Sequence, residues 1–245
     1  MSTPRLPIRQ CSQALIELLG DLDGVRLWRA DLDRDGAAEP AWAALSAAER
    51  DRYARVLDPV RRARRVVCRG AMREALGEAV GLPPDRVAVE TGRFGRPLAG
   101  DDRGVSVSVA HSGPVGVIAV SREGRVGVDV ELPRPALDPA RFARRWFTAS
   151  EAQTIAGLEA PLAADGLLRC WTVKEAVVKA LGAQLGRFLG SIAVDADLSR
   201  AASLLAVPEP LEAASFELSE LCLSQGEARV AVALRRRDRP RVNGR

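Results

Sequence analysis

The chain has 245 residues, of which 47% are hydrophobic and 28% are charged. These proportions exclude an intrinsically disordered chain and are ordinary for a globular protein with one large or two smaller domains. The formal charge of +4 suits an anionic partner without identifying it. No stretch approaches the roughly 18 apolar residues of a membrane helix, and the first ten residues lack the apolar core of a secretion signal. We therefore expect a cytoplasmic protein.

Helices and strands alternate in the first third of the chain. Apolar residues at helical spacing predict a short helix over residues 12–20, and alternation predicts a strand from Val25 to Leu32. Ser46 followed by Glu49 three residues later forms a capping-box pattern, which predicts the start of a helix. A long helix is expected from Pro59 to Val80, because a glycine and two prolines follow it closely.

The rest of the chain repeats this order. Strands separated by glycine-bearing turns are expected at residues 86–90, 105–109, 115–121 and 126–132. Helices follow over 139–145, 150–155 and 165–181, and then strands near 192, over 214–223 and over 228–235. The pattern predicts an α+β fold of two similar halves, residues 1–122 and 123–245, each with a long helix packed on a small antiparallel sheet. A basic tail is expected from about residue 236.

The strand at 126–132 carries two carboxylates on one face. Apolar residues occupy every second position, so Asp129 and Glu131 point to the same side as Gly127. Two carboxylates at this spacing repel each other unless a cation separates them, and Mg²⁺ takes such oxygen ligands beside phosphate oxygens. An edge strand with solvated acidic side chains explains this pair equally well.

A third carboxylate lies on the helix predicted over 165–181. At about 100° per residue, one side of this helix presents Trp171, Lys174, Glu175 and Lys179 within an arc of about 140°. A plain Glu–Lys surface pair would be worth about 0.3–0.5 kcal/mol and would leave the tryptophan on the polar face unexplained. Ammonium groups beside a carboxylate ligand suit a pyrophosphate bound to a metal ion. The helix therefore favours a metal–pyrophosphate site.

The other basic candidates are weaker when they are judged on residues alone. His111 is the only histidine and is expected at a strand end, where most histidines have satisfied hydrogen bonds. Arg64 and Arg65 belong to an arginine cluster at helical spacing, which is usually a solvated face. Arg96 lies in a glycine-bearing loop, where it could meet an anion or a purine ring, or simply form part of a turn.

Five motifs in this order resemble the 4'-phosphopantetheinyl transferases of the type that activates surfactin synthetase. They are Phe94-Gly95-Arg96-Pro97, Ala110-His111-Ser112-Gly113, Gly127-Val128-Asp129-Val130-Glu131, Arg145-Trp146-Phe147-Thr148 with Glu151, and Trp171-Thr172-Val173-Lys174-Glu175 with Lys179. The resemblance covers about Ser46 to Leu185. The chain departs from the family pattern at Ala110, at Glu49 and in the Gly182–Leu185 turn.

The resemblance implies an enzyme that transfers the phosphopantetheine arm of coenzyme A to a serine of an apo acyl or peptidyl carrier protein. It implies a pseudo-two-fold monomer that binds coenzyme A between its halves. Mg²⁺ would be held by Asp129, Glu131 and Glu175, with Glu175 and Lys179 as catalytic residues and Glu175 or a metal-bound water as the base. The coenzyme A-binding residues would be Arg52, Arg64, Arg65, Arg96, Pro97, His111, Ser112, Asp129, Lys174 and Lys179.

Two other functions compete with this interpretation. The arginine clusters also suit a nucleic-acid-binding protein, but aromatic residues make up only 4% of the chain and form no base-stacking ladder. A relative that binds a carrier protein without transferring anything to it is the other alternative. We expect no nucleic acid and no membrane among the partners. The sequence does not indicate which carrier protein is served, because partner choice depends on surface shape.

Overall fold

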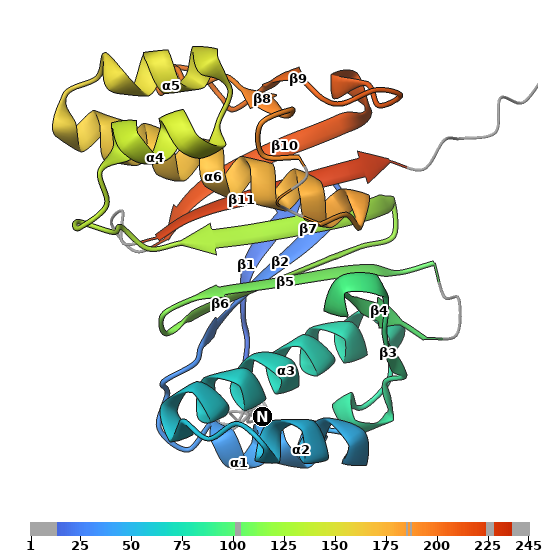
Figure 1. Cartoon of the computed structure of the whole chain (residues 1–245). Helices are drawn as coiled ribbons and strands as arrows, with labels where there is room; N and C mark the ends of the chain where they lie inside the picture. Colours follow the sequence, from blue (N-terminus) through green and yellow to red (C-terminus); the bar gives the residue numbers. More distant parts are fainter. Residues whose placement is uncertain (1–13, 101–103, 185, 187, 224–227, 237–245) are drawn as a thin grey trace, which may run out of the picture.

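The computed structural model describes residues 14–100, 104–184, 186, 188–223 and 228–236. Its elements form four layers, with helices on both outer sides and two antiparallel sheets between them (Figure 1). Most of the predicted basic tail, and the first residues of the helix predicted over 12–20, lie outside the described residues. Within the described ranges, no helix is both long enough and apolar enough to cross a membrane.

The first half begins with a hairpin and contains the first long helix. Its elements are β1 (Glu17–Leu22), β2 (Val25–Asp31), α1 (Ala38–Ala44), α2 (Ala47–Ala54), α3 (Pro59–Val80), β3 (Val89–Thr91), β4 (Pro97–Ala99), β5 (Ser106–Ser112) and β6 (Val115–Ser121). One antiparallel sheet has the order β1-β2-β6-β5. α3 packs on this sheet through Met72 and Leu76, which join Trp28 and Ile118 in a buried cluster.

The second half has the same plan without the first strand. Its elements are β7 (Gly124–Glu131), α4 (Pro139–Trp146), α5 (Ala149–Ala156), α6 (Ala160–Leu181), β8 (Ala193–Val194), β9 (Leu204–Ala206), β10 (Phe216–Leu223) and β11 (Ala228–Arg236). The larger sheet has the order β10-β11-β7, and α6 covers one of its faces. Val173 and Val177 of α6 pack there with Ala231 and Ala233 of β11.

The two halves correspond element by element. From β2 to β6 and from β7 to β11, a strand, three helices, a short hairpin and two further strands follow in the same order. The sheet orders β2-β6-β5 and β7-β11-β10 also match. Both α3 and α6 have 22 residues, and each ends at a glycine in the left-handed region, Gly81 at φ 72° and Gly182 at φ 67°. The predicted α+β fold of two similar halves is thereby confirmed.

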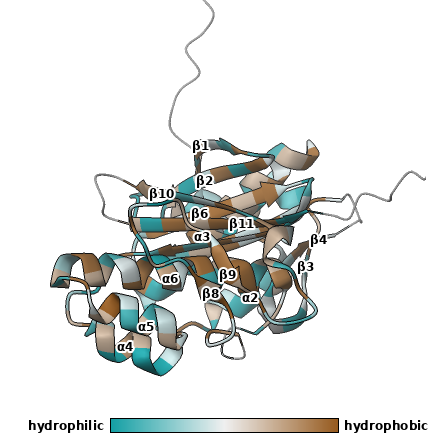
Figure 2. Cartoon of the chain, turned by 90° about the horizontal axis from the view of Figure 1, so that it is seen from above, coloured by the Kyte–Doolittle hydropathy of each residue, from teal (hydrophilic) through white to brown (hydrophobic). Residues whose placement is uncertain are grey.

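The sheets pack on each other through apolar side chains and one polar seam. Val25 and Leu27 of β2 share a buried cluster with Val128 of β7, and Figure 2 shows hydrophobic residues along the strands. At the seam, the hydroxyls of Ser106 and Ser108 on β5 accept hydrogen bonds from backbone N–H groups of β7 at 3.0 Å. The seam fixes β7, which carries the predicted carboxylates, against the first half.

The helix predicted over residues 12–20 is wrong, because Glu17–Leu22 form β1. Leu22 pairs with Val25 across a two-residue turn in which Asp23 and Gly24 have φ values of 51° and 87°. An Asp-Gly pair between two strands is a typical hairpin signal, and hairpin pairing outweighs the helical spacing here. The sequence analysis also missed α1, β4 and β9.

Candidate functional site

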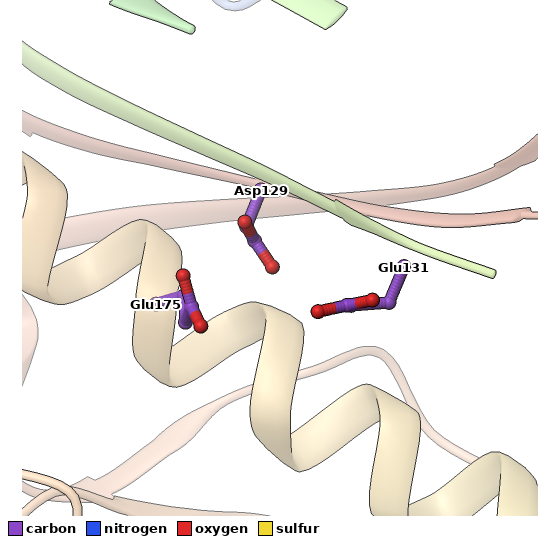
Figure 3. A group of neighbouring side chains, drawn as sticks. All are labelled: Asp129, Glu131 and Glu175. Atoms are coloured by element: carbon purple, nitrogen blue, oxygen red, sulfur yellow. The ribbon is translucent and has the colours of Figure 1, made fainter. Parts of the chain in front are cut away.

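Three carboxylates from two elements meet on one face of the second sheet. Asp129 and Glu131 come from β7 and Glu175 comes from α6, and one oxygen of each lies within 4.8 Å of the others (Figure 3). Asp129 is 4% exposed and Glu131 is 7% exposed. β7 is an edge strand of its sheet, but its two carboxylates are buried, so the alternative of solvated acidic side chains is wrong and the predicted triad is brought together.

Gly127 explains how the helix comes so near to the strand. A Cβ atom at this position would lie 1.9 Å from the carbonyl oxygen of Ala176 and 2.5 Å from the backbone nitrogen of Ala180. Both atoms belong to the backbone of α6, so they cannot yield as a flexible side chain would. Only glycine permits this close packing, which brings the neighbouring Glu175 within reach of Asp129 two residues further along β7.

Lys179 compensates part of the negative charge in the triad. Its Nζ donates to Asp129 Oδ1 at 2.7 Å and to the carbonyl of Val128 at 3.1 Å, and lies 3.6 Å from Glu175. Asp129 Oδ2 is buried and has no hydrogen-bond partner among the described residues. A buried carboxylate oxygen without a donor, beside two further carboxylates, is a donor set that suits a hard divalent cation.

The surroundings of the triad raise the pKa values of Asp129 and Glu175. Burial raises the pKa of Asp129 to about 7, and the Glu175 and Glu131 carboxylates also raise it, whereas Lys179 acts in the opposite direction. Burial likewise raises the pKa of Glu175, with Glu131 adding to this effect and Lys179 opposing it. A bound cation would reduce the electrostatic repulsion between these carboxylates.

Both oxygens of Glu131 have hydrogen-bond partners from separate parts of the fold. Ser112 Oγ donates to Oε2 at 3.0 Å, and Trp171 Nε1 donates to Oε1 at 3.1 Å. Arg134 Nη2 lies 2.8 Å and 2.7 Å from the two oxygens. These contacts explain why a tryptophan lies on the polar side of α6. The sequence analysis missed Arg134, although its position three residues after Glu131 could have indicated an ion pair.

A cationic cleft leads from the first half of the chain toward the triad. One cavity of about 310 Å³ is lined by Arg52, Arg65, Pro97 and His111, together with Tyr53 and Arg69. A neighbouring cavity of about 270 Å³ shares Gly95, Pro97 and Val109 with it and is also lined by Arg96 and Lys179. Burial lowers the pKa of His111, and Lys179 and Arg65 lower it further. The cleft suits a polyanion that extends from α3 to α6.

Comparison with known proteins agrees with this site. Residues 125–233 match the family model described as the 4'-phosphopantetheinyl transferase superfamily. The 4'-phosphopantetheinyl transferase HetI of Nostoc sp. is 32% identical over 164 residues, which make up 65% of this chain and 69% of the relative. The chain belongs to the 4'-phosphopantetheinyl transferase superfamily. This membership confirms the predicted enzyme class.

Further relatives have related names. A putative 4'-phosphopantetheinyl transferase of Synechocystis sp. is 31% identical over 160 residues, which cover 64% of this chain and 65% of the relative. A 4'-phosphopantetheinyl transferase of Bacillus pumilus is 30% identical over 120 residues, or 49% of this chain and 50% of the relative. The chain therefore matches half to about two thirds of the length of these relatives.

Two of the arginines predicted to bind coenzyme A form hydrogen bonds with other residues of this transferase. Arg64 Nε and Nη2 bind the two oxygens of Asp33 at 2.7 Å and 2.5 Å, and Arg64 does not line the cavity that contains Arg65. Arg96 donates to Ser106 Oγ at 3.3 Å, to the carbonyl of Val126 at 3.0 Å and to the carbonyl of Lys179. Arg96 therefore joins the loop of the first half to β7 and to the end of α6.

The structure does not bring Lys174 to the cleft. Its side chain is fully buried, and its Nζ donates to Glu151 Oε2 and to the carbonyl of Leu189, both at 2.7 Å. The ammonium group also lies 4.4 Å from the ring centroid of Phe147. Burial lowers the pKa of Lys174, whereas the hydrogen bond to Glu151 raises it. The turn of about 100° between successive residues separates Lys174 from Glu175 and directs it into the contact between α5 and α6.

Proposed function

We propose that this chain is a phosphopantetheinyl transferase of the surfactin-synthetase-activating type. It moves the 4'-phosphopantetheine arm of coenzyme A to the serine of an apo acyl or peptidyl carrier protein and releases adenosine 3',5'-bisphosphate. The observation that carries this proposal is the carboxylate triad of Asp129, Glu131 and Glu175, together with Lys179, which binds Asp129 and lines the cationic cleft. We further propose that it acts as a cytoplasmic monomer, with no nucleic acid or membrane among its partners.

The carboxylate triad has the donor set for Mg²⁺, and Asp129 Oδ2 is its strongest indication because it is buried without a partner. When bound, Mg²⁺ would polarise the phosphoryl oxygens and neutralise charge that develops on the pyrophosphate. The ammonium group of Lys179 lies 2.7 Å from Asp129 and adds a positive charge beside the triad. A metal ion at the triad and the ammonium group of Lys179 together would suit a bound pyrophosphate better than a bound molecule with a single carboxylate.

The cleft residues position the donor. Arg52, Arg65 and His111 line the cavity beside α3 and suit the 3'-phosphate of coenzyme A. Pro97 lies where the two cavities meet, and Lys179 lines the second one. A donor held in this way extends from α3 to α6, which fixes the β-phosphorus beside the triad.

Glu175 is the acceptor for the proton of the carrier serine. It is the least buried member of the triad, with a side chain 17% exposed, and burial raises its pKa, which makes its carboxylate more basic. The serine oxygen forms a bond to the β-phosphorus. The bond between that phosphorus and the oxygen bridging to the α-phosphate breaks, and adenosine 3',5'-bisphosphate leaves with the electron pair. Ser112 and Trp171 hold Glu131 in place meanwhile.

Intact-mass spectrometry tests the proposal. Apo acyl and peptidyl carrier proteins from fatty-acid, polyketide and nonribosomal-peptide systems are each incubated with the enzyme, coenzyme A and MgCl₂. We expect at least one carrier to gain the mass of one phosphopantetheine group, and we expect EDTA to prevent this gain. A chain that binds a carrier without any mass gain would be the non-catalytic alternative and would contradict the proposal.

The orientation of the donor is tested with coenzyme A that lacks its 3'-phosphate. If Arg65 and His111 hold this phosphate, the wild-type enzyme has a higher KM for dephospho-coenzyme A than for coenzyme A. The variant Arg65→Gln should raise KM for coenzyme A about tenfold, as expected for the loss of one charge-assisted contact, and should no longer discriminate between the donors. Arg62→Gln on the same helix serves as the control. Unchanged discrimination in Arg65→Gln would contradict the assignment.

A further inference from the structure

We propose that Arg134 is the counter-cation of the metal site, which holds Glu131 in the absence of a divalent cation and leaves when one binds. Arg134 would thereby set the affinity of the site for its metal. This inference rests on the proposed metal site of Asp129, Glu131 and Glu175.

The guanidinium of Arg134 occupies the place beside Glu131 that a metal ion would take. Arg134 places a single nitrogen, Nη2, between the two oxygens of Glu131 at 2.8 Å and 2.7 Å. A divalent cation that binds a carboxylate through both oxygens takes the same position. Ser112 and Trp171 each bind only one of these oxygens. They can keep Glu131 in place while the guanidinium and a metal ion exchange.

The charges at the site show why Arg134 is the group that leaves. Three carboxylates face two cations of the chain, Lys179 at Asp129 and Arg134 at Glu131. The Arg134 side chain is 54% exposed and that of Lys179 is 32% exposed. An ion pair with a solvated partner is weak and is easily replaced by a stronger one. Lys179, which also binds the carbonyl of Val128, is the better anchored of the two.

The backbone around Arg134 is restricted, and a cavity lies beside its side chain. Arg134 lies between Pro133 and Pro135, whose rings restrict the chain here, so the exchange needs side-chain rotation only. Arg134 also lines a cavity of about 370 Å³ together with Leu137 and Leu168. The released side chain has space there beside the metal site.

Titration with Mn²⁺, followed by electron paramagnetic resonance without coenzyme A or carrier, tests this inference. We expect Arg134→Gln to bind Mn²⁺ about two- to fivefold more tightly than the wild type, because the metal no longer displaces an ion pair. Arg141→Gln is the matched control, since it removes the same charge from an exposed arginine of the nearby α4. Glu131→Gln identifies the site, because it should weaken Mn²⁺ binding strongly.

The outcomes separate this inference from the proposed function. Unchanged or weaker Mn²⁺ binding in Arg134→Gln would overturn the inference, because Arg134 would then orient Glu131 instead of competing for it. Equal tightening in Arg141→Gln would also overturn it, because the effect would be one of net charge. If the wild type showed no Mn²⁺ binding that depends on Glu131, the proposed metal site itself would fail. Matching thermal unfolding midpoints would exclude a folding defect in the variants.

Discussion

The two halves of this transferase have the same plan, but among the described residues only the second half carries a carboxylate triad. α3 spans residues 59–80 and α6 spans 160–181, an offset of 101 residues. At this offset Asp129 and Glu131 of β7 correspond to Trp28 and Ala30 of β2, which are both 1% exposed and apolar. The first half therefore has apolar core side chains at the two positions where the second half has carboxylates. The fold alone does not create the site, which depends on two strand positions.

The long helices differ less than the strands. Glu175 corresponds to Glu74, whose Oε2 accepts a hydrogen bond from the backbone of Leu15 at 2.9 Å. Lys179 corresponds to Glu78, so the first half also lacks the cation that lies beside the triad. Glu74 therefore serves as a natural control for Glu175, because it has the same side chain on an equivalent helix without the site.

A buried ion pair is common to both halves. The capping-box residue Glu49 of α2 binds Arg73 of α3 at 2.8 Å, and the capping-box residue Glu151 of α5 binds Lys174 of α6 at 2.7 Å. Arg73 and Lys174 have the same offset of 101 residues as the helices. In each half, the pair ties a short helix to the long one. This feature belongs to the scaffold rather than to the chemistry, which explains why Lys174 is not in the cleft.

The largest expected change in stability comes from breaking one of these pairs. Lys174→Met should lower the free energy of unfolding by about 3–5 kcal/mol, because it leaves the carboxylate of Glu151 buried without its partner. Arg73→Met should also be destabilising in the first half, where the side chain is 3% exposed, but by less, because Glu49 keeps its ion pair with Arg69. Urea denaturation measures both. A loss below about 1 kcal/mol in Lys174→Met would contradict this expectation.

A smaller change is expected where the halves differ in helix packing. Gly127→Ala should cost about 1–3 kcal/mol and weaken metal binding, because the added Cβ meets the α6 backbone. The corresponding position of the first half carries Arg26, which reaches Glu78 instead. Gly166→Ala within α6 is the control, since its nearest neighbour would lie at 3.4 Å and alanine favours a helix. Thermal unfolding and Mn²⁺ titration would detect the difference, and equal behaviour of both variants would refute the packing argument.

The smallest expected effect is the pH dependence contributed by Glu49. Burial alone would raise the pKa of Glu49, but hydrogen bonds from Ser46, Arg69 and Arg73 lower it overall. Its contribution to stability is therefore present above the unfolded value of about 4.5 and is lost as the pH falls through the folded pKa.

The variant Glu49→Gln tests this pH dependence. Its unfolding free energy should differ from that of the wild type by a constant amount above pH 5, and this difference should shrink below about pH 4.5 as Glu49 becomes protonated. Urea denaturation from pH 7 to pH 3 measures the difference. A difference that does not depend on pH would count against an ionised Glu49.

Much of the fold could be predicted because the signals are local. The capping pattern at Ser46 and the glycine after Val80 mark helix ends through backbone hydrogen bonds that lie a few residues apart. The alternation of apolar residues around Asp129 is also a local signal, and it predicts that Asp129 and Glu131 lie on one face of their strand. The Asp23-Gly24 turn is an equally local signal, and the prediction of a helix over 12–20 overlooks it.

The parts of the site that could not be predicted depend on contacts between distant residues. Ser112 binds Glu131 across 19 residues and Lys174 binds Glu151 across 23. Whether Lys174 faced the cleft or the interior depended on how α5 packs on α6, which the helical period alone cannot give. Arg134 is near enough in sequence for its contact with Glu131 to be expected, but the sequence does not show that Glu131 lies beside Asp129 and Glu175.

Transfer rates of three proteins, measured by intact-mass spectrometry on one apo carrier protein with coenzyme A and Mg²⁺, decide whether the triad performs the chemistry. The wild type and Glu74→Gln should load the carrier at similar rates, since Glu74 lies in the half without strand carboxylates. Glu175→Gln should be slower by about 100-fold or more, because it loses both a metal ligand and the proton acceptor. A near-normal rate in Glu175→Gln, or equal inactivation of Glu74→Gln, would contradict the assignment of catalysis to the second half.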